Sequence, residues 1–148
     1  MRSLQTKMGL LIVAFLIAVT TAAAKENWLQ FKYDCRHSGN VPGRSVTTPP
    51  GLIGAVPLTD AVFTAPVVAD GRVYVVDGAG VVFCIDTATL RVVWKFSTPG
   101  GKSNCNNVSS PAIAVLGTPY GGRYLHFGTM AGSYYVLNTA NGTVIKEI

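Results

Sequence analysis

The cysteines and histidines carry the most distinctive chemistry in this sequence, because together they could bind a metal or form a disulfide. There are three cysteines, Cys35, Cys84 and Cys105, and two histidines, His37 and His126. None of them has the CxxC or Cys–His spacing of a zinc site, so we expect no metal site. Cys84 lies in an apolar, strand-like run, which favours a buried and inert thiol. Cys35 and Cys105 lie in polar surroundings and could pair, but a disulfide needs a geometry that sequence leaves open.

The carboxylates are the next candidates for chemistry, as general acids or bases or as metal ligands. Most of them stand in turn sequences, including Asp60, Asp70, Asp77 and Asp86. Aspartate in a tight turn usually accepts hydrogen bonds from its own backbone. The serines and histidines lack the context of a hydrolase nucleophile. We therefore predict no catalytic, cofactor-binding or metal-binding residue in this chain.

Three further polar or aromatic features have a plain structural interpretation. The run 104–107 reads Asn-Cys-Asn-Asn and is explained by a surface loop. Asn107 and Asn141 begin glycosylation sequons, which matter only in a eukaryotic secretory pathway, and their use is left open. Tyr134 and Tyr135 could bind a ligand together, but strand alternation places them on opposite faces. We expect them to pack between blades.

Composition and charge narrow the class of protein. The chain has 148 residues, of which 49% are hydrophobic and 13% are charged, with 16 glycines and a net charge of +5. This length accommodates one modest domain, and the apolar content excludes a disordered chain. Glycine and proline interrupt almost every apolar run after residue 40, which argues against a helical bundle. The basic residues form no block, so we expect no nucleic-acid partner.

The N-terminal residues have the pattern of a secretory signal. Arg2 and Lys7 precede an uncharged apolar run at 9–19, and small residues follow it. We predict a signal peptide over residues 1–24, cleaved after Ala24, and hence a periplasmic or extracellular protein. The alternative is a retained membrane anchor. The apolar run gives way to threonine and alanine before it reaches the roughly 20 apolar residues that a membrane span needs. After cleavage we expect no stable membrane span, and no cysteine near the cleavage point supports lipid modification.

Short apolar runs alternate with glycine- and aspartate-rich turns from residue 62 onward. The Asp70-Gly71 pair is a strong hairpin indication, because glycine tolerates the positive φ of tight turns. Strands joined by such short turns form an antiparallel meander. The expected strands of this first meander are 64–69, 72–77, 81–86 and 91–96.

The second half of the chain repeats the first. Pro111 corresponds to Pro66, and Asn138 corresponds to Asp86. The second repeat has extra residues at 116–121, between its first two strands. A four-stranded unit that recurs after about 40–50 residues is typical of propeller blades. We therefore predict an all-β fold of β-propeller blades, each a four-stranded antiparallel meander, forming a partial propeller.

The run 80–94, which reads Gly-Val-Val-Phe-Cys-Ile-Asp-Thr-Ala-Thr-Leu-Arg-Val-Val-Trp, resembles the PQQ-type repeat of quinoprotein-like β-propellers. Two positions depart from that pattern: Leu90 replaces a turn glycine, and Lys146 stands where the second repeat would have tryptophan. After the signal peptide (1–24), the resemblance implies four segments, namely an N-terminal lead-in segment (25–50), the outer strand of a closing blade (51–63), a first blade (64–108) and an incomplete second blade (109–148).

The resemblance specifies fold more than function, since one propeller fold serves many roles. We expect a non-enzymatic binding or assembly scaffold that presents propeller loops to a protein or small ligand. The alternative is the N-terminal part of a dehydrogenase dependent on pyrroloquinoline quinone and calcium, with catalytic residues beyond this chain. No catalytic residue of that family maps onto this sequence. We interpret the chain as an N-terminal fragment, with an oligomer of two-blade chains as the rival, because two blades cannot close a ring of at least about four.

Overall fold

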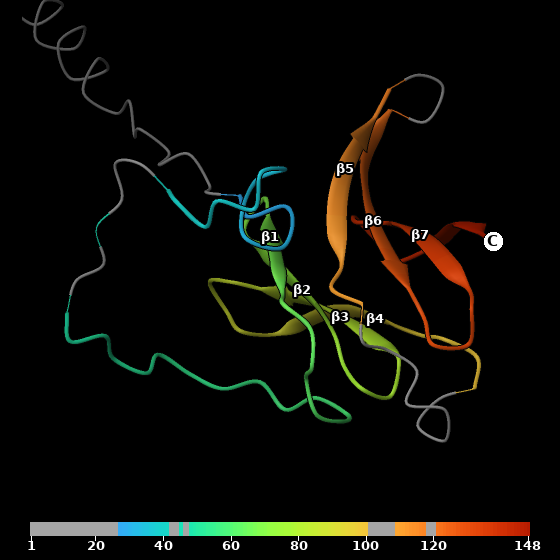
Figure 1. The fold of residues 1–148 in the computed structure, drawn as a ribbon. Helices are drawn as coiled ribbons and strands as arrows, with labels where there is room; N and C mark the ends of the chain where they lie inside the picture. Colours follow the sequence, from blue (N-terminus) through green and yellow to red (C-terminus); the bar gives the residue numbers. More distant parts are fainter. Residues whose placement is uncertain (1–26, 42–44, 46–47, 101–108, 118–120) are drawn as a thin grey trace, which may run out of the picture.

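The computed structural model describes residues 27–41, 45, 48–100, 109–117 and 121–148. All regular secondary structure in these ranges is strand, arranged as two four-stranded antiparallel sheets with orders β1-β2-β3-β4 and β5-β6-β7-β8 (Figure 1). The all-β prediction and the two predicted meanders are confirmed. The proposed signal peptide at residues 1–24 lies outside the described residues.

Each sheet follows the sequence without a crossover, because every connection within it is a turn or a short loop. The strands are β1 (Val67–Ala69), β2 (Arg72–Val76), β3 (Val81–Asp86), β4 (Val92–Ser97), β5 (Ala112–Leu116), β6 (Gly122–Gly128), β7 (Tyr134–Asn138) and β8 (Val144–Glu147). The extra residues of the second repeat fall between β5 and β6, where they leave the strand pairing intact.

Two turns show how the sequence fixes the meander. Asp70 and Gly71 have φ values of 52° and 75°, which confirms the tight β1–β2 hairpin. Leu90, between β3 and β4, has φ 56°, close to the 74° of Gly142 at the corresponding point of the second sheet. The leucine therefore takes the left-handed conformation that glycine would adopt there, and the turn type is kept.

The two sheets share one core. It contains buried residues of both sheets, and Leu29, Trp94 and Phe96 pack against it. The Tyr135 ring stacks on Phe127 with centroids 5.4 Å apart and lies 5.5 Å from Phe96 of the first sheet. The buried members are Val67, Ala69, Tyr74, Val76, Val82, Cys84, Ile113, Leu125, Phe127, Tyr135 and Leu137.

One turn of the second sheet is held by three side chains of the first. Trp94 Nε1 donates to the carbonyl oxygen of Thr139 at 3.1 Å, and the Tyr74 hydroxyl donates to the same oxygen at 3.2 Å. Arg72 donates to the carbonyl oxygens of Thr139 and Ala140 at 3.3 and 3.1 Å. A Cβ at Gly142 would lie 2.6 Å from the Trp94 ring, so only glycine lets the indole approach this closely.

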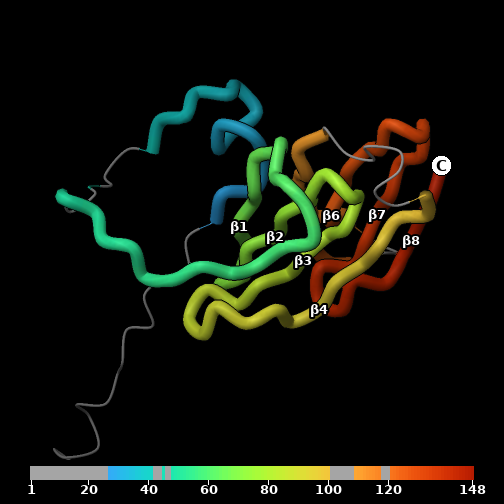
Figure 2. The backbone as a smooth tube through the Cα atoms, turned by 90° about the horizontal axis from the view of Figure 1, so that it is seen from below, coloured from blue at the N-terminus to red at the C-terminus, as the bar shows by residue number. Residues whose placement is uncertain are grey.

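The other face of the first sheet is covered by the segment 54–63 (Figure 2). Val56 and Leu58 pack against a cluster that includes Val75, Phe83 and Ile85. The structure assigns no strand to residues 51–63 and no described strand pairs with them, so their role as the outer strand of a closing blade stays a prediction. A strand requires a hydrogen-bonded neighbour, and the segment lies over a sheet face rather than along a sheet edge.

Asp77 fastens this covering segment to the sheet. Its carboxylate is fully buried and accepts hydrogen bonds from the backbone N–H groups of Thr59 and Asp60 at 3.1 and 3.0 Å. The same carboxylate accepts from Ala79 and Val81 at 3.1 and 3.0 Å, within the β2–β3 turn. Four donors thus satisfy a carboxylate that would otherwise be costly to bury.

Replacing Trp94 by alanine is expected to destabilise the chain by about 3 kcal/mol, because it removes a large side chain that packs on the shared core. Trp94→Phe keeps an aromatic ring that is smaller than the indole and loses the Nε1 hydrogen bond, so it should destabilise the chain by about 1–2 kcal/mol, less than the alanine variant. Urea unfolding followed by circular dichroism measures both. A loss below about 1 kcal/mol for the alanine variant would mean that the two sheets do not dock through Trp94.

Candidate binding site

The lead-in segment connects the innermost strands of both sheets. The backbone of Trp28 exchanges hydrogen bonds of 2.7 and 2.8 Å with Val68 of β1. The amide of Ile113 on β5 donates to the carbonyl oxygen of Leu29 at 2.7 Å. The side-chain oxygen of Asn27 accepts from the Asp70 amide at 3.0 Å. These contacts hold residues 27–29 across both sheets.

The loop that follows is organised by one carboxylate. Asp34 accepts from the amides of Arg36 and Ser38 at 3.1 and 2.9 Å and from the Ser38 hydroxyl at 2.7 Å. The hydrogen bond from the Ser38 amide is the main reason that the pKa of Asp34 is lowered. Lys32 and His37 both have positive φ values, of 55° and 53°. The loop therefore curls tightly back over β1.

A cavity of about 580 Å³ lies between this loop and β1. We call it the lead-in cavity. Its size falls in the range of about 300–1,000 Å³ that is usual for small-molecule sites, and apolar atoms dominate its lining. The lining residues are Asn27, Trp28, Phe31, Lys32, Gly39, Ala65, Pro66 and Val68.

The aromatic and cationic groups of the lead-in cavity suit an apolar group that carries a negative charge. Phe31 is 46% exposed, so its ring is available to a ligand. The Lys32 ammonium lies 5.6 Å from the centroid of that ring. Trp28 packs against Tyr33 with ring centroids 5.3 Å apart, which fixes the other aromatic wall. Aromatic rings bind flat apolar groups, and the adjacent ammonium favours an anion or a hydrogen-bond acceptor.

The carboxylates singled out in the sequence have structural roles. Asp60 and Asp86 accept from amides just after them, as expected for turn residues. Asp77 does the same and also fastens the covering segment. Asp70 differs, because its carboxylate forms an ion pair with Arg123 of the second sheet at 3.3 Å. Within the described residues, no three His, Cys, Asp or Glu side chains gather closely enough to hold a metal ion.

The structure tests some of the predictions that were made for the cysteines and for the tyrosine pair. Cys84 is fully buried in β3, and burial raises the pKa of its thiol, as expected for an inert cysteine. Cys35 is exposed, whereas Cys105 lies outside the described residues, so their pairing stays a prediction. Tyr135 is 2% exposed in the shared core, and Tyr134 is 42% exposed on the opposite face, which confirms the expected alternation. Tyr135 therefore packs between the two sheets as predicted, whereas Tyr134 does not.

Sequence reasoning missed two features. The first is the lead-in cavity, whose walls come from segments about 35 residues apart that no local pattern joins. The second is the environment of His126, whose Nδ1 lies 3.2 Å from the Tyr134 hydroxyl and whose Nε2 is buried without a partner among the described residues. Burial lowers the pKa of His126, which favours its neutral form. The repeat register could have identified this position, because His126 corresponds to Tyr74.

The geometry defines a class of protein: two consecutive blades of a β-propeller, docked face to face. The structure resembles that of a quinohemoprotein alcohol dehydrogenase from Comamonas testosteroni, with a TM-score of 0.62 and 22% sequence identity. The match covers 87% of this chain and 20% of that protein, so the chain spans about a fifth of its length. At this identity the likeness establishes the fold alone. Comparison with curated protein sequences finds no match.

Residues 55–148 match a PQQ-type repeat family profile described as outer membrane protein assembly factor BamB. The chain therefore belongs to the PQQ-type repeat family, and the resemblance first noted at 80–94 is confirmed. The described part of the chain contains no helix of the length and hydrophobicity that a bilayer crossing requires.

Proposed function

We propose that this protein is an exported, non-enzymatic scaffold that binds an apolar, acidic segment of another protein or a small ligand in its lead-in cavity. The observation that carries the proposal is the cavity itself, with Phe31 and Trp28 facing Ala65, Pro66 and Val68 beside a single ammonium, that of Lys32. These groups can hold a ligand, but none of them is paired with an acid or base that would transform it.

The placement of the cavity also supports a binding role. Its walls are fixed by the Trp28–Val68 backbone pair and by the loop that Asp34 organises. A preformed site binds at a smaller entropic cost than one that must order on binding. Membership of a family whose profile is described as an assembly factor is consistent with a scaffold.

The second candidate is the N-terminal part of a quinone-dependent dehydrogenase, and the structural likeness to a quinohemoprotein alcohol dehydrogenase favours it. Pyrroloquinoline quinone and calcium would need a set of oxygen ligands. The buried carboxylate of Asp77 is already satisfied by four backbone amides, and the described residues supply no cluster of acidic ligands. The described residues therefore do not fit this pair of cofactors.

Binding in the lead-in cavity can be tested with 1-anilinonaphthalene-8-sulfonate, an aromatic anion that matches the cavity chemistry. Phe31→Ser should weaken binding by about tenfold, because burying an aromatic ring contributes roughly 1.5–3 kcal/mol. Lys32→Gln should weaken it by a few fold through loss of the charge. Fluorescence titration of the full chain measures both dissociation constants.

Phe63→Ser is the matched control, since Phe63 is 69% exposed and lies outside the lead-in cavity. It should leave the dissociation constant unchanged. Equal affinity of the wild-type chain and the Phe31→Ser variant would overturn the assignment of the site. Retention of pyrroloquinoline quinone with calcium during dialysis would instead support the dehydrogenase candidate.

The export part of the proposal rests on the pattern at residues 1–24 and is tested separately. A fusion of residues 1–40 to alkaline phosphatase should be active only outside the cytoplasm, and its mature N-terminus should be Lys25. Lys7→Glu together with Arg2→Glu should reduce export, because the basic start of the signal is lost. A fusion that stays uncleaved and cytoplasmic would contradict export.

A further inference from the structure

The turn that the first sheet holds contains a sequence that is prone to spontaneous chemistry. We call residues 138–143 the β7–β8 turn. Asn141 is the only asparagine in the sequence that precedes a glycine. Glycine has no side chain to hinder its backbone nitrogen from attacking the asparagine before it, so asparagine loses its amide most readily in this dipeptide. Asparagine counts among the thermolabile residue types, and here that lability is concentrated at one turn.

Asn141 is open to water, and the packing of a further blade would not change this. Asn138 corresponds to Asp86 in strand register, so Asn141 corresponds to Thr89 of the first sheet. Thr89 is exposed although the second sheet packs on the first. A blade packed in the same way on the second sheet would likewise leave Asn141, which is exposed, accessible to water.

The side-chain carbonyl of Asn141 is polarised in the native turn. Its Oδ1 accepts hydrogen bonds from the backbone amide of Thr143 at 3.1 Å and from the Thr143 hydroxyl at 2.9 Å. Two donors directed at a carbonyl oxygen stabilise the negative charge that develops there when a nucleophile attacks the carbon. The turn therefore holds the asparagine side chain in a form that favours attack.

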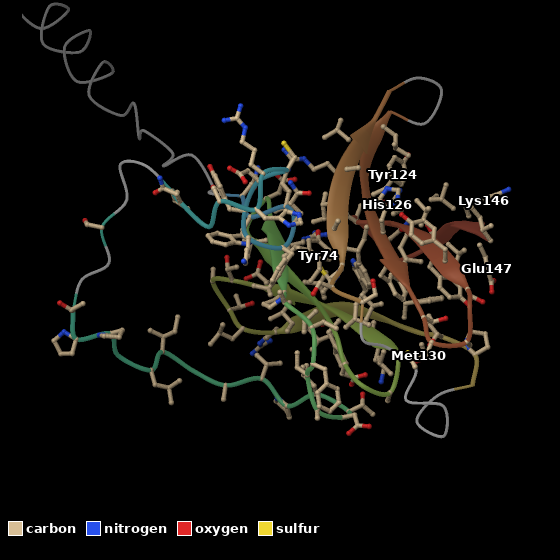
Figure 3. The ribbon with its side chains drawn as sticks, viewed as in Figure 1. Tyr74, Tyr124, His126, Met130, Lys146 and Glu147 are labelled. Carbon is tan, nitrogen blue, oxygen red and sulfur yellow. The ribbon has the colours of Figure 1, made fainter. Side chains whose placement is uncertain are left out.

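The nucleophile, in contrast, is restrained by the docking of the two sheets. The backbone N–H of Gly142 donates to the carbonyl oxygen of Asn138 at 2.8 Å, and Gly142 packs closely against the ring of Trp94. Tyr74 lies between the two sheets (Figure 3) and, like Trp94, donates to the carbonyl oxygen of Thr139. The glycine nitrogen must leave its acceptor before it can turn toward the preceding side chain, and these contacts oppose that movement.

We propose that Asn141 is a deamidation site that the docking of the two sheets protects. In the reaction, the backbone nitrogen of Gly142 loses its proton to the solvent and bonds to Cγ of Asn141. The bond from Cγ to Nδ2 breaks, and the amide nitrogen leaves as ammonia. Water then opens the cyclic imide to give aspartate or isoaspartate. Water is the only co-reactant, nothing is oxidised or reduced, and the inference does not depend on the function proposed above.

The isoaspartate product makes release of the turn irreversible. Its backbone runs through the former side chain, which places one extra carbon between residues 141 and 142. The added atom moves Gly142 relative to both Asn138 and Trp94, so the 2.8 Å hydrogen bond and the close contact with the indole cannot both be kept. Release of the turn therefore promotes deamidation, and the isoaspartate then opposes redocking.

The test is the rate at which the full chain loses the Asn141 amide in mildly alkaline buffer, followed by peptide mapping with mass spectrometry. The native wild-type chain should react at least about tenfold more slowly than the same chain unfolded in urea. Trp94→Ala should raise the native rate at least about tenfold, because it removes both the indole contact and a hydrogen bond. Tyr74→Phe removes one hydrogen bond alone and should raise the rate a few fold.

Phe83→Ala is the matched control, because Phe83 is 6% exposed in the cluster on the far face of the first sheet. It weakens the fold without touching the contacts of the turn, so the native rate should stay at the wild-type value. Asn141→Gln should abolish amide loss at this turn, since glutamine forms the larger cyclic imide far more slowly. Circular dichroism confirms that each variant is folded, and Tyr74→Phe serves if Trp94→Ala is not.

The fate of the product is followed by proton NMR on chains aged in the same buffer. Chains with isoaspartate at position 141 should lose the contact between the Trp94 ring and the α-protons of Gly142. Asn141→Asp has the charge of the product with a normal backbone, so it should keep that contact.

Three results would overturn the proposal. If the urea-unfolded chain keeps the Asn141 amide, the residue is not a deamidation site. If the native and unfolded chains react at the same rate, docking protects nothing. If Trp94→Ala and Phe83→Ala accelerate the reaction equally, amide loss follows unfolding of the whole chain rather than release of the turn.

Discussion

The backbone carbonyl of Thr139 is the point on which the arrangement of the two sheets depends. It accepts hydrogen bonds from Trp94, Tyr74 and Arg72, which lie on two different strands of the first sheet. Three directional hydrogen bonds to one oxygen fix the orientation of one sheet against the other. The apolar contacts of the shared core are not directional and constrain that orientation less. Desolvation from this packing raises the pKa of Tyr74 to about 12, so its hydroxyl remains a donor at any ordinary pH. Gly142 completes the contact, since a side chain there would displace the indole.

Further contacts hold the first sheet at its inner edge and on its far face. Residues 27–29 connect β1 to β5 at the inner edge, and the Asp70–Arg123 ion pair adds a contact between the same two sheets. On the far face, Asp77 holds the covering segment through backbone amides alone. The first sheet is therefore enclosed on both faces, which explains why β3 is apolar on both sides.

The strands and turns could be read from the sequence because they rest on local rules. Asp70-Gly71 requires a tight hairpin, and the repeat between Asp86 and Asn138 sets the register of both sheets. Cys84 was correctly placed in the core for the same reason. Whether segment 51–63 forms a strand stays a prediction, because strand pairing depends on a neighbour that the local sequence does not reveal.

The binding site was harder to predict than the fold. Trp28 pairs with Val68, and Phe31 and Pro66 line the same cavity, although the members of each pair lie far apart in the sequence. No residue type at these positions suggests a ligand, since aromatic side chains are also common in protein cores. The capping roles of Asp60 and Asp86 followed from their turns, whereas the ion pair of Asp70 depends on the second sheet.

The docking of the two sheets is most directly tested by proton NMR of the full chain at Gly142. The account predicts a nuclear Overhauser effect between the Trp94 ring and the Gly142 α-protons, together with a strong upfield ring-current shift of those protons. The two residues are 48 positions apart in sequence, so only the docked arrangement brings them together. Gly142 α-protons at ordinary shifts with no such effect would show that the two blades do not dock as described.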